Sequence, residues 1–383
     1  MRHGTDDPLR PVWLRRLTVL LAVLAVGHLG TGWYFSNQIR SGALEIVNPS
    51  ETSYDLLIKD VSNQAIEIVA GDDADVRSPG TWGVSWPGGN GVVGEIISVT
   101  DNSVVREFSI ESELPSIEAF VNIEPFAYAG TPRTAHELEF EEITFVSPLG
   151  RLGAWHIPTE GKKWVIFVHG KSGTRSESLR MIPALHQANF DVVAIDYRND
   201  PGAPIDPSGF HRQGLTEWED LAAAVDYVSA AGAESIFIFG SSMGGGITAN
   251  YLLEAPNADR VDAVVLDSPV LNFEATVDSQ ADQFHVPGSI RNAAKALASW
   301  RFGVDWSATD YTASPDEYNT PMLIFHGAKD TSVPIGPSRE LAQARPDLVS
   351  LIESPGAAHV RSWNADPGQY ELALIDFLTL AAR

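Results

Sequence analysis

Phe237-Ile238-Phe239-Gly240-Ser241-Ser242-Met243-Gly244-Gly245-Gly246 is the stretch that decides the fold of this chain. The apolar run 235–239 leads into a Gly-x-Ser-x-Gly pentapeptide, and a helical stretch follows from about Met243 to Glu254. This order of strand, sharp turn and helix is typical of a nucleophile elbow, in which a strained turn exposes a serine hydroxyl. The sequence therefore predicts Ser242 as a nucleophile. The alternative is a glycine-rich turn that carries an incidental serine.

The residues on either side of Ser242 suit such a turn. Gly240 and Gly244 flank it at positions where a Cβ would collide with the neighbouring strand or helix backbone. The N–H of Met243 begins the helix, so it is free to bind an oxyanion and gains from the helix dipole. Met243 is therefore the first candidate for an oxyanion hole.

From Glu141 onward, apolar runs alternate with helical segments. The runs 143–146 and 152–156 predict an antiparallel pair, and six further runs span 164–168, 192–195, 236–239, 261–266, 322–325 and 348–352. Near-continuous apolar strands that alternate with helices indicate a mostly parallel sheet covered on both faces. We therefore expect an α/β domain over 141–383, with its site at the carboxyl ends of the strands.

The clearest predicted helix of this domain spans 217–230. Thr216 and Glu219 have the spacing of a capping box at its start. Apolar residues recur at helical spacing along one face, and they are Trp218, Leu221, Val225 and Val228.

Two strand ends supply partners for the serine. Asp330 lies in the turn after the run 322–325, and of the ten histidines His359 alone follows the last strand. A serine hydroxyl needs an adjacent base, histidine can take and return its proton, and a carboxylate orients the imidazole. The predicted catalytic residues are therefore Ser242, Asp330 and His359, in the chain order expected for this fold.

Other residues near these strand ends compete for the same roles. Asp267, at the end of the run 261–266, is the alternative acid. We favour Asp330 because a tight turn before Val333-Pro334 presents it better. His326 precedes the acid in the same turn and is expected to pack.

The segment His169-Gly170-Lys171-Ser172-Gly173 follows the run 164–168. Its Gly-Lys-Ser suggests a phosphate-binding loop, but that motif needs a glycine where this chain has Val165. The segment instead fits the loop that supplies the second oxyanion N–H, which we assign to Lys171. His169 is then a packing residue that shapes the loop.

Taken together, these motifs resemble the α/β-hydrolase superfamily, and within it the membrane-anchored BEM46-like and serine-aminopeptidase-like hydrolases. The resemblance covers about residues 141–381 and implies the fold and a serine-nucleophile hydrolase, in a superfamily that acts on esters, thioesters and peptides. Where members commonly carry Asn or Gly after His-Gly, this chain has Lys171. The matching segments are His169-Gly170, Asp196-Tyr197-Arg198, 240–245, Asp267-Ser268-Pro269 and 326–330.

The N-terminal part is apolar enough to enter a membrane. Residues 17–35 are 19 residues without an acidic or basic side chain, and ~20 residues cross a bilayer. Arginines flank the start of this run, and Trp33 and Tyr34 lie at its far end. The positive-inside rule predicts a cytoplasmic segment 1–16, a transmembrane anchor 17–35 and an extracytoplasmic remainder. A cleaved signal peptide is the alternative.

Between the anchor and the α/β domain, turn residues separate five short β-like runs, at 54–61, 65–69, 81–86, 91–99 and 104–110. They predict a small antiparallel β module over 41–113, followed by a connector at 114–140. Trp82 and Trp86 either pack in this module or line a ligand surface. The sequence identifies no protein partner for it.

Within the α/β domain, the segment 268–320 is an excursion that we expect to cap the nucleophile, with a helix near 289–300. Trp300, Phe302 and Trp306 suggest an apolar acyl pocket, with core packing as the equal alternative.

Composition excludes several classes of function. The net charge is −24, although five arginines and two aspartates make the first 40 residues basic. Such an acidic body repels nucleic acid. The chain has no cysteine, which excludes disulfides, thiolate catalysis and zinc–thiolate sites. We expect no cofactor and no metal.

These observations predict an exported, membrane-tethered serine hydrolase that cleaves carboxylic esters through an acyl-enzyme. Its expected substrate is a small or lipid-like acyl compound. A serine peptidase or an acyltransferase would use the same residues. The alternative of another class is a non-catalytic surface interaction protein on a hydrolase fold.

Overall fold

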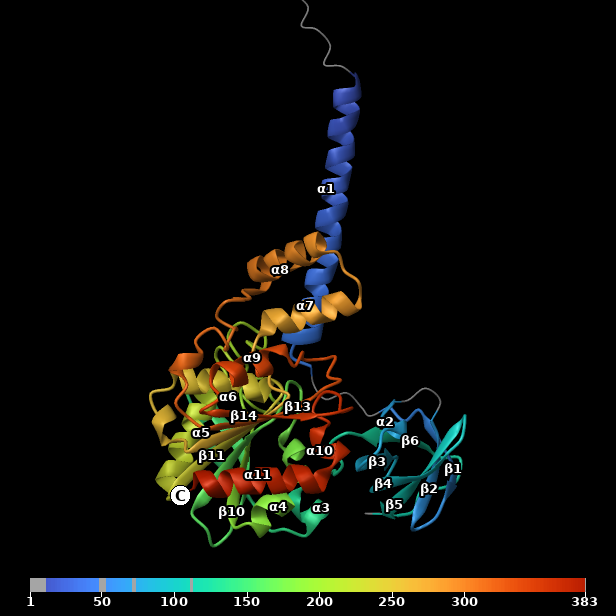
Figure 1. Ribbon diagram of the computed structural model, residues 1–383, viewed down its shortest axis with the longest axis vertical. Coiled ribbons are helices and arrows are strands. Elements are labelled where there is room, and N and C mark those ends of the chain that lie inside the picture. The colour runs from blue at the N-terminus through green and yellow to red at the C-terminus, as the bar shows by residue number, and fades with distance from the viewer. Residues whose placement is uncertain (1–11, 48–52, 71–73, 111–112, 383) are drawn as a thin grey trace, which may run out of the picture.

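The structure is a computed structural model that describes residues 12–47, 53–70, 74–110 and 113–382. Most of the predicted cytoplasmic segment, residues 1–11, therefore lies outside the described residues. The described chain forms a long N-terminal helix, a small β-barrel and an α/β domain (Figure 1).

The α/β domain is built on an eight-stranded sheet in the order β14-β13-β12-β11-β9-β10-β8-β7. All neighbours from β14 to β10 pair in parallel, whereas β8 and β7 are antiparallel, as the sequence predicts. The strands are β7 (Glu141–Ser147), β8 (Gly150–Ile157), β9 (Lys163–Val168), β10 (Phe190–Ile195), β11 (Ser235–Ser241), β12 (Ala263–Asp267), β13 (Met322–Gly327) and β14 (Val349–Ser354).

Helices cover both faces of this sheet, because its central strands are buried along their whole length. One apolar cluster packs under α5, α6 and α9, and a second packs under α4 and α11. These helices are α4 (Ile182–Gln187), α5 (Trp218–Ala231), α6 (Met243–Glu254), α9 (Gly336–Ala344) and α11 (Pro367–Ala381).

The predicted capping box at the start of α5 is wrong. The helix begins at Trp218, and its N-cap residue Glu217 makes no side-chain cap hydrogen bond. Thr216 instead donates its hydroxyl to Asp206, and the carboxylate of Glu219 pairs with Arg198. Charged partners elsewhere in the domain therefore take both side chains away from the helix terminus.

The β module is a closed antiparallel barrel in the order β1-β2-β5-β4-β3-β6. The sequence predicts five of its strands but places the sixth, β6, in the connector 114–140. Trp82 and Trp86 are buried in the barrel core, so they pack rather than line a surface. The strands are β1 (Leu56–Val61), β2 (Ala65–Val69), β3 (Trp82–Trp86), β4 (Gly89–Val99), β5 (Ser103–Ile110) and β6 (Phe120–Glu124); the short helices α2 (Ala74–Arg77) and α3 (Pro132–His136) accompany them.

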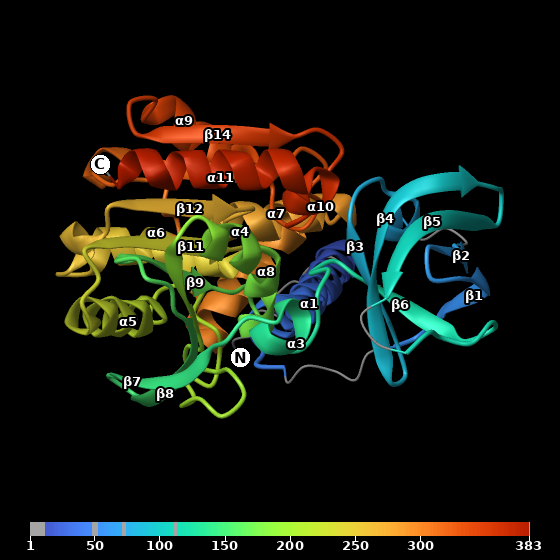
Figure 2. The ribbon, with the colours of Figure 1, turned by 90° about the horizontal axis from the view of Figure 1, so that it is seen from below.

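The barrel lies beside the α/β domain, next to the short helix α10, Ser362–Ala365 (Figure 2). Asn364 of α10 is fully buried and donates its amide to the carbonyls of Thr81 and Pro125, at 2.8 and 2.7 Å. Its side-chain oxygen accepts a hydrogen bond from Arg180 at 3.1 Å. One amide therefore joins the barrel to the segment just after His359.

The N-terminal helix α1, Val12–Ile39, continues into a π-helical turn η1, Arg40–Leu44. Within the described residues it is the one helix long and apolar enough to cross a membrane. The excursion 268–320 forms two helices, α7 (Phe273–Gln283) and α8 (Gly288–Phe302), of which the sequence predicts only the second. Both lie around the lower end of α1 (Figure 1).

We expect Asn364→Ala to loosen the barrel from the α/β domain, because two buried carbonyls and Arg180 lose a partner. The free energy of unfolding should fall by about 2–4 kcal/mol, which chemical denaturation would measure. Asn319→Ala is the matched control, since Asn319 is exposed and bonds only a nearby carbonyl. Equal stability of the two variants would contradict this role of Asn364.

Candidate active site

Ser242 occupies a strained turn between β11 and α6, with φ 52° and ψ −114°. A non-glycine residue adopts such angles only where its surroundings enforce them. Gly244 lies so close to β9 that an added Cβ would stand 2.2 Å from the carbonyl oxygen of Val168. At Gly240 a Cβ would stand 2.6 Å from the carbonyl oxygen of Gly244. Both glycines therefore let the turn close as the sequence predicts.

Three predicted site residues from three strand ends lie in one chain of hydrogen bonds. Nε2 of His359 is 2.9 Å from Oγ of Ser242, and Nδ1 of His359 is 2.7 Å from Oδ2 of Asp330. The side chain of His359 is partly exposed, whereas that of Asp330 is fully buried. The imidazole can therefore face both the serine and the solvent-accessible cavity.

The carboxylate of Asp330 is held ionised by its surroundings. Burial alone would raise its pKa, but hydrogen bonds from His326 and His359 and from the Val333 N–H hold that pKa below its ordinary range. The N–H groups of Ser332 and Val333 donate to Oδ1 at 2.9 and 2.8 Å. His326 is fully buried and lies 3.4 Å from Oδ2, a contact that the sequence does not reveal.

Asp267, the alternative acid, has other partners. Its side chain is fully buried and accepts a hydrogen bond from the hydroxyl of Tyr370 at 2.9 Å. Burial raises the pKa of this carboxyl, although the charge of Arg180 opposes the shift. Its backbone carbonyl accepts the N–H of Ser242 at 2.9 Å. Asp267 thus holds the backbone of the turn at Ser242. Among the described residues, no hydrogen bond joins its carboxyl to His359.

His169 shapes the loop after β9 from a fully buried position. Its Nε2 lies 2.9 Å from Asp200 and its Nδ1 lies 2.8 Å from the carbonyl of Gly170. Burial alone would lower its pKa, but the charge of Asp200 raises that pKa to about 9. Because both ring nitrogens face acceptors, the imidazole is best satisfied as a cation that donates twice. The hydroxyl of Tyr197 donates to Gly170 at 2.9 Å and holds the same loop.

The two predicted oxyanion donors border the cavity in front of the serine. Met243 and Lys171 both line it, and Gly170 lies against the Cβ of Ser242. Within the part of the chain that the structure describes, neither the Met243 nor the Lys171 N–H has a hydrogen-bond acceptor. Both donors are therefore available to an oxygen bound beside Ser242.

A group of three side chains near this loop has the composition of a metal site. Ligand atoms of His169, Asp196 and Asp200 lie within 4.8 Å of one another. They are already engaged, because Arg175 pairs with Asp196 at 2.9 Å and Asp200 bonds His169. Burial raises the pKa of Asp196 to about 6. This donor set is saturated by protein partners and gives no reason to assign a metal.

The cavity in front of Ser242 has a volume of about 380 Å³. The cap contributes Phe273, Thr276 and Gln280 from α7, whereas Gly42 and Ala43 come from the end of the N-terminal helix. No sequence signal marks those two small residues as part of a site. They reach it because the chain after α1 folds back onto the α/β domain.

The aromatic residues predicted for an acyl pocket lie elsewhere. Trp300, Phe302 and Trp306 are absent from the lining of this cavity. Trp300 is 76% exposed, and Trp306 stacks on Phe273 with ring centroids 5.4 Å apart. The packing alternative therefore describes Phe302 and Trp306, and Trp300 serves neither role.

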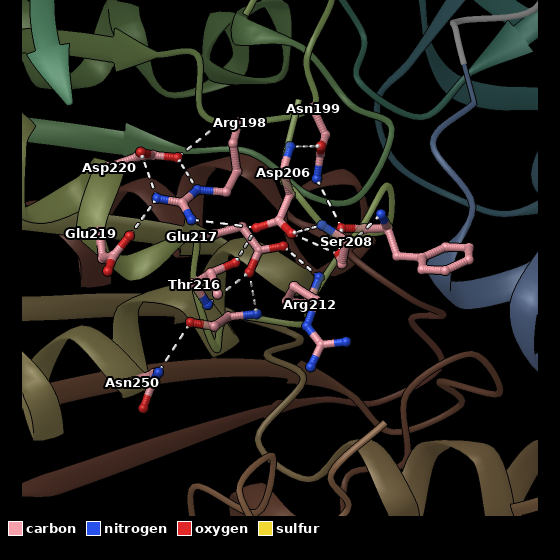
Figure 3. A network of polar contacts seen from close by, with 12 residues as sticks. Arg198, Asn199, Asp206, Ser208, Arg212, Thr216, Glu217, Glu219, Asp220 and Asn250 are labelled. Atoms are coloured by element: carbon pink, nitrogen blue, oxygen red, sulfur yellow. Dashed lines mark hydrogen bonds and ion pairs between the residues drawn. The ribbon is translucent and has the colours of Figure 1, made fainter. Parts of the chain in front are cut away.

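A buried polar network fixes the loop 198–217 (Figure 3), from which Gln213 lines the cavity. Arg198 bonds both oxygens of Asp220, at 2.7 and 3.0 Å. The carboxylate of Glu217 accepts the N–H groups of Arg212 and Gly214 at 2.6 and 3.0 Å. Burial raises the pKa of Glu217, although these donors favour its ionised form. The network holds a loop that has little secondary structure of its own.

Comparisons with known proteins agree with this architecture. A family model described as the alpha/beta hydrolase fold matches residues 163–287. The uncharacterised protein YfhR of Escherichia coli K12 is 28% identical over 254 residues, which are 63% of this chain and 81% of YfhR. Human ABHD12B is 24% identical over 247 residues, which are 60% of this chain and 62% of ABHD12B.

A Pyrococcus furiosus esterase of known structure superposes with a TM-score of 0.53 and 20% identity, covering 66% of this chain and 94% of the esterase. This likeness concerns the fold. These comparisons confirm the predicted fold and support the predicted resemblance to the α/β-hydrolase superfamily. At the family level, the comparisons support a hydrolase.

The geometry predicts that Asp330 and not Asp267 orients the imidazole. Asp330→Asn should lower kcat by on the order of 10³–10⁴-fold, because the amide favours the wrong tautomer of His359. Asp267→Asn keeps an acceptor for Tyr370 and should lower kcat by less than about tenfold. Steady-state kinetics on both variants, with circular dichroism as a check on folding, would measure this. A larger loss in Asp267→Asn than in Asp330→Asn would mean that Asp267, at the end of β12, is the acid that orients His359.

Proposed function

We propose that this protein is a membrane-anchored serine hydrolase that cleaves carboxylic esters through an acyl-enzyme. The observation that carries the proposal is the continuous hydrogen-bond relay from Ser242 through His359 to Asp330. The strained elbow and two unoccupied N–H groups beside the serine support the same chemistry.

In the acylation step, Oγ of Ser242 attacks the ester carbonyl carbon while Nε2 of His359 takes the hydroxyl proton. Asp330 stabilises the imidazolium that forms and keeps its Nδ1–H directed away from the serine. The N–H groups of Met243 and Lys171 stabilise the oxyanion of the tetrahedral intermediate. The intermediate collapses as the alcohol leaves with the proton from Nε2.

Deacylation repeats these steps with water. His359 takes a proton from a water molecule, which attacks the acyl carbonyl, and then returns that proton to Oγ as the carboxylic acid leaves. The partly exposed imidazole gives water access to the acyl-enzyme. A peptide substrate or an alcohol acceptor would use the same groups, so only the leaving and accepting groups separate a peptidase or an acyltransferase from this esterase.

The proposed anchor is α1. Large apolar side chains of this helix are exposed, which suits a lipid environment; they include Val19, Leu20, Leu21, Val23, Val26 and Leu29. Arg10, Arg15 and Arg16 precede the apolar run 17–35, and by the positive-inside rule we expect the N-terminus to be cytoplasmic. The barrel and the α/β domain then lie on the extracytoplasmic side.

Ser242→Ala should abolish ester hydrolysis, with a loss of about 10⁴-fold or more. The wild type should react with a fluorophosphonate probe, since only an activated serine attacks the phosphorus, and the variant should not. Ser241→Ala is the matched control, because its hydroxyl belongs to the same turn but not to the relay. Failure of the wild type to be labelled would favour the non-catalytic alternative.

The topology predicts which part of the chain is accessible from outside. Protease added to sealed, right-side-out vesicles should digest residues 41–383 and leave a short membrane-embedded fragment. Inverted vesicles should protect the body of the protein. The opposite pattern would reverse the orientation, and release of the body by a salt wash would rule out the anchor.

A further inference from the structure

A second cavity lies between the N-terminal helix and the cap. Its volume is about 180 Å³, and α1 contributes Tyr34, Phe35 and Ile39 to its lining. The cap helix α7 contributes Val277 and Ala281. Most of the surface that lines this cavity is apolar. Arg291 also lines it, and its guanidinium donates a hydrogen bond to the carboxylate of Asp282.

This second cavity adjoins the catalytic one. Gly42, Ala43 and Gln280 line both. Together the two spaces extend from Ser242 past the π-helical turn η1 to the region between α1 and α7. We call the second cavity and this junction the anchor–cap groove.

The wall that α1 contributes to the groove is firmly attached to the α/β domain. Leu44 is buried, and its carbonyl accepts the N–H of His211 at 2.8 Å. The amide of Gln213 donates to the carbonyl of Ala43 at 2.7 Å. These bonds come from the loop that the buried network of Arg198 and Glu217 holds in place. The anchor is therefore a part of the substrate site and not a flexible tether.

The cap is attached to the anchor as well. Arg301 of α8 donates to Ser36 at 2.6 Å and to Asn37 at 2.9 Å, and its guanidinium lies 3.5 Å from the ring centroid of Trp33. Phe284 lines the groove at the turn between α7 and α8 and is 79% exposed. An exposed phenylalanine at the rim suits contact with acyl chains of a bilayer.

We propose that the anchor–cap groove holds the acyl chain of the substrate, so that the enzyme selects esters of long unbranched fatty acids taken from the membrane. This inference rests on the proposed esterase function and names the substrate class of that same site. Each methylene buried in the groove strengthens binding through the hydrophobic effect. The anchor then has a second role, because it forms the wall along which the chain enters.

Gly42 offers a direct way to close the junction of the two cavities. A Cβ built on it would meet no atom within 4 Å, so a side chain can start from this position without a clash at its first carbon. Gly42→Leu should fill the junction, and Ala281→Trp should fill the groove from the cap side. Gly30→Leu is the matched control, because Gly30 has equally open surroundings on α1 but lines neither cavity.

The test uses the full chain in nanodiscs and compares kcat/KM for para-nitrophenyl palmitate and para-nitrophenyl butyrate. The palmitate-to-butyrate ratio should fall by about tenfold or more in Gly42→Leu and Ala281→Trp, which corresponds to about two methylenes losing their burial. Gly30→Leu should keep the wild-type ratio. An unchanged ratio in both groove variants would overturn the groove while leaving the esterase function standing.

A binding experiment tests whether the groove holds an acyl chain independently of whether the enzyme hydrolyses esters. Ser242→Ala in nanodiscs is exposed to palmitate that carries a terminal diazirine, irradiated and mapped by mass spectrometry. Crosslinks should fall on residues 34–43 and 277–286, and Ala281→Trp in the same background should lose them. Crosslinks confined to other segments would overturn the inference even if the enzyme hydrolyses esters. Lack of any hydrolysis by the wild type, with crosslinks in the groove, would overturn the proposed function alone.

Discussion

The forced backbone of Ser242 is the constraint on which the rest of the structure depends. A serine at φ 52° is unfavourable alone, and it persists because α6 packs closely over β9 and β11. That packing requires glycine at 244, where even a methyl group would meet the carbonyl of Val168. The Ser242 N–H is meanwhile bound by the carbonyl of Asp267 on the neighbouring strand. The hydroxyl can therefore point only toward the cavity at the strand ends.

Much of the α/β domain and of the candidate site could be predicted from the sequence. The strands are nearly continuous apolar runs, and the residues that follow them must meet at one edge of a parallel sheet. Ser242, Asp330 and His359 each follow such a run, so their meeting depends on topology more than on fine packing. His326 shows the limit of this reasoning. Its burial suggests packing, yet its position beside Asp330 is a matter of side-chain geometry that no spacing reveals.

Other features depend on contacts between distant segments. β6 pairs with β1 and β3, which lie far from it in the sequence, and the local pattern of the connector does not reveal these partners. Thr216 has the local pattern of a helix cap, but its hydroxyl donates a hydrogen bond to Asp206 instead. Gly42 and Ala43 line the cavity in front of Ser242, but neither residue has a functional group that would mark it in the sequence as part of a site. In each case a long-range partner overrides the local pattern.

Hydrogen bonds from several elements hold the loop that carries His359, and through them the barrel is connected to this residue. The N–H of Val360 donates to the hydroxyl of Ser268 after β12, and its carbonyl accepts from Arg180. Arg180 also bonds Asn364, whose amide binds the barrel. The position of the imidazole is thus set jointly by the sheet, the buried guanidinium and the barrel. Gly42 and Ala43, at the end of the N-terminal helix, also line the cavity. Two segments that precede the α/β domain in the sequence therefore contribute to its site. The barrel and the N-terminal helix therefore act as supports of the candidate site.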